Sequence, residues 1–73
     1  MEARILEATL KAHIAEIRKR LDQAAGIAKA AEACAETGNT EKAIEIALDI
    51  EQLVYEATTF LNAASLMNRI YKT

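Results

Sequence analysis

One short break between two long segments of helix-forming residues constrains this chain more than any other feature. Residues 36–42 read ETGNTEK, in a chain with no proline and only two glycines. Ala, Glu, Lys, Leu and Arg, which have high helix propensity, dominate on either side. Gly38 suits the left-handed position just past a helix end, and Asn39 or Thr40 suits the cap of the next helix. The sequence predicts helix 1 over about 2–36, a turn at 37–40 and helix 2 over about 41–72.

Apolar residues in both segments recur with the alternating three- and four-residue spacing of helices that pack along a seam. In helix 1 the series begins at Ala3 and, after a first gap of seven residues, continues through Leu10, Ile14, Ile17, Leu21, Ala24, Ala28, Ala31 and Ala35. In helix 2 it is Ala43, Ile46, Ile50, Leu53, Ala57, Phe60, Ala64, Met67 and Tyr71. When the chain folds back at Gly38, small residues face large ones in most layers, as close packing requires. We predict an all-α antiparallel two-helix hairpin spanning residues 1–73 as a single domain.

The seams leave further apolar residues on the flanks of both helices, among them Leu6, Ile27 and Cys34 in helix 1. An apolar stripe wider than one seam is typical of a helix with more than one neighbour. The sequence therefore predicts that two hairpins dimerise into a four-helix bundle. The residues expected in the hairpin and dimer core are Leu6, Leu10, Ile14, Ile17, Leu21, Ile27, Ile46, Ile50, Leu53, Val54, Phe60, Leu61, Met67 and Ile70.

The charges are distributed unevenly along the predicted hairpin. The terminal end, residues 1–20 and 61–73, holds seven basic and three acidic residues, whereas residues 21–60 at the turn end hold two basic and eight acidic. An antiparallel dimer brings each basic end beside the acidic end of its partner, and a parallel dimer brings like charges together. The sequence therefore favours the antiparallel homodimer.

Composition excludes several classes of protein and favours a cytoplasmic one. Only 4% of the residues are aromatic and none is Trp, so a stacking surface for nucleic-acid bases is not expected. No stretch approaches the roughly 18 uncharged apolar residues of a membrane span, and the first residues do not resemble a signal peptide. The single cysteine excludes a disulfide within the chain and fits a reducing compartment.

Binding of nucleic acid, specifically RNA, is an alternative hypothesis. Arg4, Lys11 and Arg18 repeat every seven residues along helix 1, and Lys19 and Arg20 follow them. Such a basic line contacts phosphates in many proteins. The predicted architecture also resembles the RNA-binding four-helix bundle of Rop-like regulators, by analogy of size and architecture alone. We favour the interpretation that these residues form a solvated face with pairs such as Glu7–Lys11 and Glu16–Arg20.

Metal binding is the second alternative. His13 and Glu16 form an H-x-x-E pair, and helix 2 offers Glu45, Asp49 and Glu56 but no histidine. Metal sites in helical bundles need a fuller set of ligands, so we favour a rim position for His13.

The remaining chemistry is sparse. Cys34 lies near a helix end among acidic residues, which is typical of a small buried side chain and not of a reactive thiol. No nucleophile–base pair or glycine-rich loop occurs, and we predict no enzyme activity and no cofactor. The expected function is that of a protein-interaction or regulatory module that acts through homo-oligomerisation and through contacts with another protein.

Overall fold

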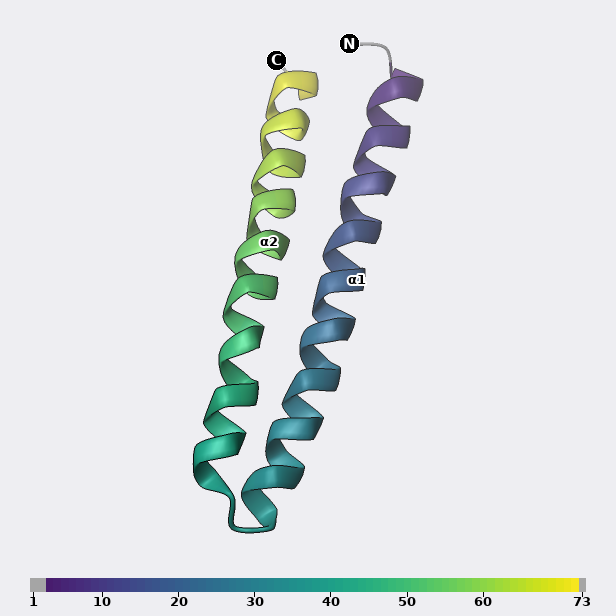
Figure 1. The fold of residues 1–73 in the computed structure, drawn as a ribbon. Coiled ribbons are helices and arrows are strands. Elements are labelled where there is room, and N and C mark those ends of the chain that lie inside the picture. The colour runs from purple at the N-terminus through teal and green to yellow at the C-terminus, as the bar shows by residue number, and fades with distance from the viewer. Residues whose placement is uncertain (1–2, 73) are drawn as a thin grey trace.

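A computed structural model describes residues 3–72 of the 73-residue chain. It contains two long helices, α1 (Ala3–Glu36) and α2 (Thr40–Lys72), and no strand among the described residues. The helices run side by side in opposite directions, with the turn at one end and both termini at the other (Figure 1). The predicted all-α hairpin is confirmed. The expected first residue of helix 1, Glu2, lies outside the described residues.

The turn ends α1 through backbone hydrogen bonds that depend on Gly38. Its φ of 87° lies in the left-handed region, which glycine enters without steric cost. The N–H of Gly38 donates to the carbonyl of Ala35 at 3.0 Å, and the N–H of Asn39 donates to the carbonyl of Cys34 at 3.0 Å. This pair of bonds is the Schellman motif, which satisfies carbonyl groups that the helix end would leave unpaired.

Asn39 caps the start of α2. Its side-chain oxygen accepts a hydrogen bond from the N–H of Lys42 at 3.2 Å, and its carbonyl accepts one from the N–H of Ala43 at 3.0 Å. Glu41 follows in the first turn, where its negative charge complements the positive end of the helix dipole. Of the two cap residues that the sequence suggests, the structure selects Asn39.

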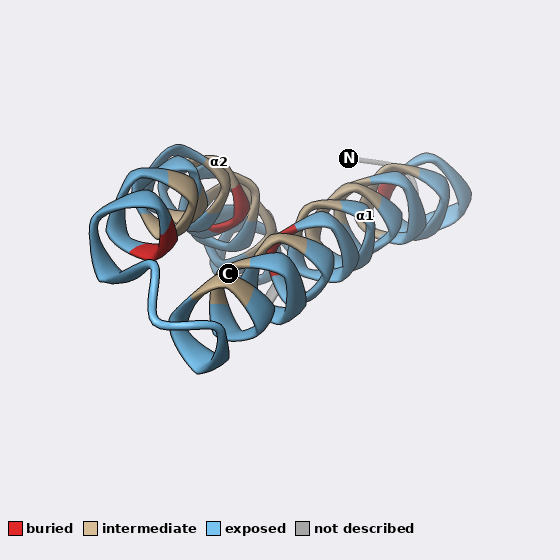
Figure 2. Cartoon of the chain, turned by 60° about the horizontal axis from the view of Figure 1, so that its bottom comes forward, coloured by how far each residue is buried: buried red, intermediate tan, exposed pale blue. Residues whose placement is uncertain are grey.

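The side of α2 that faces α1 is the predicted one. Residues at the expected seam positions from Ala43 to Met67 are buried or half-buried, whereas Tyr71 in the last turn is exposed. Figure 2 shows the buried and half-buried positions as a stripe along each helix on the side that faces the other. The three- and four-residue spacing therefore identifies the packing face of α2 correctly.

The seam predicted for α1 is only half right. Leu10, Ile17, Ala24 and Ala31 are buried or half-buried, as expected. The other predicted positions are exposed, and Ile14 and Leu21 retain 60% and 48% of their accessible surface; this exposed set is Ala3, Ile14, Leu21, Ala28 and Ala35. The residues that face α2 instead are His13, Arg20, Ile27 and Cys34, each one position before an exposed residue of the predicted seam. Leu6, seven residues before His13, continues the same line. Leu6, Ile27 and Cys34, which the sequence assigned to an outer flank, therefore belong to the hairpin itself.

Contacts of Phe60 define the register of the two helices. The Phe60 ring lies 5.7 Å from the His13 ring, edge to face, and 4.6 Å from the Arg20 guanidinium carbon. His13 and Arg20 lie on either side of Ile17 along α1, so Phe60 lies at the height of Ile17. This is the register that folding at Gly38 predicts.

The hairpin is a thin rod with little interior. Its Cα atoms span 54 × 15 × 12 Å, and the radius of gyration is 16.7 Å, against about 11 Å for a globular chain of this length. Among the described residues, only four hydrophobic ones expose less than one-tenth of their surface: Leu6, Ala24, Ala43 and Ala57. Three of the four are alanines, so the two helices alone bury few large side chains.

Neither helix meets the requirements for crossing a bilayer: within residues 3–72, no segment is both long enough and apolar enough.

Candidate functional site

A polar cluster lies at the middle of the hairpin and joins the two helices. The Nε of Arg20 donates to the Glu56 carboxylate on α2 at 3.1 Å, and its Nη1 donates to the carboxylate of Glu16 on α1. Gln52 donates from its amide nitrogen to the second oxygen of Glu56 at 3.1 Å. The guanidinium also stacks over Phe60, a cation–π contact. One arginine therefore connects two carboxylates and an aromatic ring.

The hydrogen bonds of this cluster favour its charged forms. The hydrogen bond from Arg20 lowers the pKa of Glu16 below its ordinary value of 4.5. Hydrogen bonds from Gln52 and then from Arg20 lower the pKa of Glu56 below the same value. The pKa of Arg20 is raised, mainly by its bond to Glu16. All three groups stay ionised at neutral pH, and the cluster is a structural link and not a source of protons.

His13 lies beside this cluster and is held by two contacts. Its Nδ1–H donates to the carbonyl of Thr9 at 2.8 Å, and its ring packs edge to face on Phe60. Glu16, which would be its partner in the metal-binding alternative, bonds Arg20, as the favoured interpretation expects. No group of three or more His, Cys, Asp or Glu side chains suitable for a metal occurs in the described part of the chain. The position of His13 at the rim of the hairpin core agrees with the interpretation that we favour from the sequence.

Cys34 faces the other helix near the turn and is half-buried. Its carbonyl accepts hydrogen bonds from the Asn39 N–H and from the Thr37 hydroxyl, the latter at 2.9 Å. The residue therefore takes part in the end of α1 through its backbone, while its side chain packs between the helices.

The structure separates Arg20 from the other basic residues predicted as nucleic-acid contacts on α1. Lys11 pairs with Glu7 at 3.2 Å, and Arg18 pairs with Asp22 at 3.0 Å. Arg20 turns toward α2 and is only 22% exposed, so it lies apart from the others. Arg4 and Lys19 lie on the exposed surface. Pairs of this kind partly neutralise the basic line, as expected for a solvated charged face.

The residues predicted for the hairpin and dimer core divide into two groups. Nine lie between the helices and are buried or half-buried: Leu6, Leu10, Ile17, Ile27, Ile46, Ile50, Leu53, Phe60 and Met67. Five remain exposed on this hairpin: Ile14, Leu21, Val54, Leu61 and Ile70. The prediction that these five residues belong to a core would require a second molecule to cover them.

Four of the exposed residues share one side of the hairpin. Ile14 and Leu21 each follow an inward residue of α1 by one position, and Val54 and Leu61 do the same on α2. Since the helices run in opposite directions, one step forward along either chain turns toward the same side of the hairpin. We call this surface the side face and define it by Ile14, Leu21, Val54 and Leu61.

The residues of the side face also match in height along the rod. Ile14 lies 24 residues before Gly38 and Leu61 lies 23 residues after it; Leu21 and Val54 lie 17 before and 16 after. The register places each pair at the same level, and both levels are near the middle of the helices. Alanines at 28, 35 and 47 continue the side face toward the turn. The large apolar side chains are therefore concentrated at the centre of this face.

Comparison with known proteins found no matching family model, no similar curated protein and no similar solved structure.

Proposed function

We propose that this chain is a protein-interaction or regulatory module of a reducing compartment such as the cytoplasm, and that it acts as an antiparallel homodimer. Two hairpins pack through their side faces and form a four-helix bundle. The observation that carries the proposal is the side face, on which four large apolar side chains lie exposed at the centre of a hairpin that has little core of its own. Surfaces of this kind on small proteins usually pack against another molecule.

The surface area of the chain supports a dimer of ordinary size. The accessible area is 5465 Å², whereas a compact folded protein of this mass exposes about 4,450 Å². The excess of about 1,000 Å² is close to the roughly 800 Å² that each partner buries in a standard protein interface. Packing of two rods side by side removes an excess of this kind, since it converts an elongated surface into a thicker bundle.

Two-fold symmetry suits the arrangement of residues on the side face. An axis that crosses the rod near its middle brings α1 against α1 and α2 against α2, each pair antiparallel. Ile14 of one chain then meets Leu21 of the other, and Val54 meets Leu61. Large apolar groups come together around the axis, and the alanines near the turn leave room for the longer side chains at the partner's terminal end.

The charges support the same orientation. In an antiparallel pair, the basic terminal end of each hairpin lies along the acidic turn end of the other. A parallel pair brings eight acidic residues of one turn end beside eight of the other. These charges are exposed and screened by salt, so they set the orientation more than the affinity.

Native mass spectrometry on untagged protein tests the oligomeric state directly. The chain has a mass of 8.0 kDa, and the proposal requires a species of twice that mass that persists on dilution into the low micromolar range. A monomer across the whole concentration series contradicts the proposal. A metal or nucleotide adduct would instead support a metal-binding or nucleotide-binding function.

A further inference from the structure

A second apolar surface lies on α2, on the side turned away from α1. At 3.6 residues per turn, four of its large side chains fall within about 40° of one another around the helix. They are Ile44, Leu48, Tyr55 and Leu66, and all are more than half exposed. We call this surface the outer strip. The inward residues of α2, such as Ile46, Leu53 and Phe60, lie on the opposite side of the same helix.

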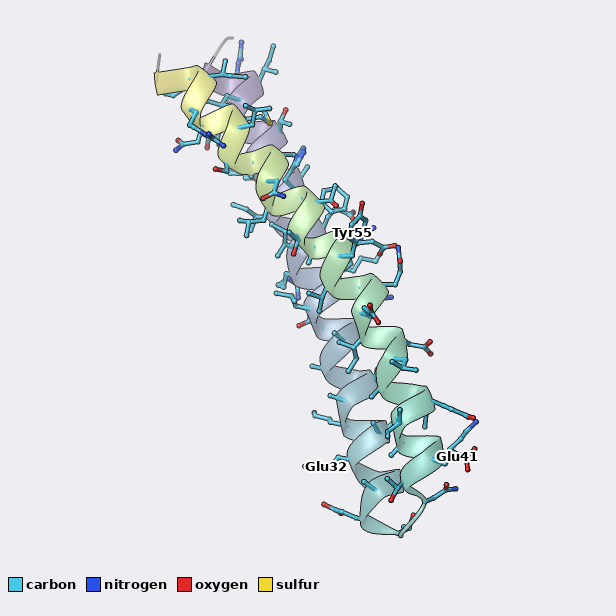
Figure 3. The ribbon with its side chains drawn as sticks, turned by 90° about the vertical axis from the view of Figure 1, so that its left-hand side faces the viewer. Glu32, Glu41 and Tyr55 are labelled. Atoms are coloured by element: carbon cyan, nitrogen blue, oxygen red, sulfur yellow. The ribbon has the colours of Figure 1, made fainter. Side chains whose placement is uncertain are left out.

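Figure 3 looks onto the hairpin from the α2 side, with Tyr55 labelled about midway along the helix and Glu41 near the turn. Leu48 and Tyr55 border a shallow depression together with Glu51 and Gln52. The outer strip runs for about 33 Å between Ile44 and Leu66, since each helical residue adds 1.5 Å, and the polar Asn62 interrupts it between Tyr55 and Leu66. That length accommodates a partner helix of about 20 residues.

The outer strip is separate from the side face. Val54 and Leu61 of the side face lie about 100° around α2 from the outer strip, so a dimer that covers one leaves the other exposed. The side face has a symmetric arrangement about the middle of the rod, whereas the outer strip has acidic residues along one half only. The acidic half of the outer strip therefore favours a partner that carries basic side chains there.

The charge beside the outer strip specifies that partner. Glu41, Glu45 and Glu51 flank it in the half near the turn, and Lys42, which pairs with Glu45 at 3.5 Å, is the one basic residue between positions 41 and 56. A second copy packed strip to strip about Tyr55 would pair Glu41 with Arg69 but would set Glu45 and Glu51 against neutral residues near positions 65 and 59. A helix with an apolar stripe flanked by lysine or arginine pairs these carboxylates instead.

We infer that the outer strip of α2 docks a basic amphipathic helix of another protein. The partner lays its apolar stripe along Ile44, Leu48, Tyr55 and Leu66, and its basic flanks meet Glu41, Glu45 and Glu51. Apolar burial supplies most of the affinity, and the carboxylates select the charge of the partner. This inference does not depend on the proposed dimer, because the two surfaces are separate.

Two synthetic helical peptides test the inference with the full chain. One has a leucine stripe at helical spacing with lysines at the flanks, and the other replaces each lysine by glutamate. Binding is measured by fluorescence anisotropy at near-physiological salt and again at higher salt. We expect the lysine peptide to bind at least about tenfold more tightly than the glutamate peptide, with the difference shrinking as salt rises. Equal binding of the two peptides overturns the inference.

Matched variants locate the bound peptide. Leu48→Ala should weaken binding of the lysine peptide about tenfold, because the residue lies between Ile44 and Tyr55 in the apolar contact and beside the flanking carboxylates. Ile5→Ala is the control, since Ile5 is 58% exposed against 60% for Leu48 but lies on α1. Glu51→Gln should weaken binding about threefold and reduce its dependence on salt. If Leu48→Ala and Ile5→Ala weaken binding alike, the peptide does not occupy the outer strip and the inference is wrong.

Native mass spectrometry of the same samples separates this inference from the proposed dimer. A dimer that binds neither peptide overturns the docking inference alone. A monomer that binds the lysine peptide through Leu48 supports the inference and contradicts the dimer. If Leu48→Ala changes the number of copies in the wild-type assembly, a second copy covers the outer strip and the inference fails.

Discussion

Leu61→Ala is the sharpest perturbation of the proposed dimer. Leu61 lies at the centre of the side face, and 57% of its surface is exposed in the single hairpin. Alanine has a higher helix propensity than leucine, so the substitution leaves α2 itself intact. The matched control is Leu48→Ala, in which the same residue type, 60% exposed on the same helix, points away from the side face.

The exposure of Leu61 gives the size of the expected effect. The substitution removes three carbons, worth about 2.4 kcal/mol when fully transferred from water to an apolar interior, at about 0.8 kcal/mol each. The dimer can bury only the 57% that is exposed in the hairpin, which leaves about 1.4 kcal/mol per copy. Two copies contribute to each dimer, so the total is about 2.7 kcal/mol, or roughly a hundredfold increase in the dimer dissociation constant.

Sedimentation equilibrium over a wide range of concentrations measures that constant for the wild type and for both variants. Leu61→Ala should shift the monomer–dimer midpoint to about a hundredfold higher concentration, and Leu48→Ala should leave it in place. Circular dichroism at high concentration checks that both variants remain helical. Equal dissociation constants for the two variants would refute the reasoning, because the side face would then contribute no more than an unrelated exposed leucine.

Three further predictions follow from the turn, the polar cluster and the cysteine. Gly38→Ala should lower the free energy of unfolding by about 1 kcal/mol, because the φ of Gly38 is 87°. Gly26→Ala should raise it by a similar amount, because Gly26 lies inside a helix and a Cβ there meets nothing within 4 Å. If urea titrations show that both substitutions change the free energy of unfolding in the same direction, this prediction is wrong. Since hydrogen bonds hold the pKa values of Glu16 and Glu56 below 4.5, their stabilisation is full above pH 4.5 and is lost as the pH falls through the lowered values. Glu56→Gln should therefore make the acid-induced loss shallower, and an unchanged pH profile of unfolding would exclude the effect. In an antiparallel dimer the two Cys34 residues lie about 50 Å apart at 1.5 Å per residue, so mild oxidation should give little disulfide-linked dimer; efficient crosslinking would indicate the parallel orientation.

The sequence predicted the hairpin well because its strongest signals are local. Gly38 determines where α1 ends, and a polar cap with an acidic first turn determines where α2 begins. The apolar spacing in α2 is unambiguous, so its packing face was identified correctly. These features depend on residues close together in the chain, and no knowledge of the partner helix is needed to interpret them.

The packing face of α1 could not be assigned from apolar residues alone. Ile14 and Leu21 are more hydrophobic than His13 and Arg20, and a count of apolar positions selects the wrong pair. The structure places His13 and Arg20 against Phe60, where a ring and a long aliphatic stem pack while the polar groups reach hydrogen-bond partners. The seven-residue spacing that these two share with Leu6 is the signal that would have found them.

The side face was predicted only in part, because the packing face of α1 was assigned incorrectly. Val54 and Leu61 were expected outside the hairpin seam and are exposed, whereas Ile14 and Leu21 were expected inside it and form the rest of the side face. The link between Arg20 and Glu56 spans 36 positions in the chain. It depends on the register of two helices, which the sequence indicates only after the hairpin has been assumed.

The placement of both termini at one end of the rod determines where a domain fused to this chain would lie. A domain fused to either terminus sits beside the same pole of its own hairpin and far from the turn (Figure 1). In the proposed antiparallel dimer the two poles would be opposite, so two fused domains would be held about one rod length apart, and the rod measures 54 Å. The assembly would then act as a spacer of fixed length. In a parallel dimer, by contrast, both pairs of termini would lie at the same end of the assembly, and the two fused domains would be neighbours.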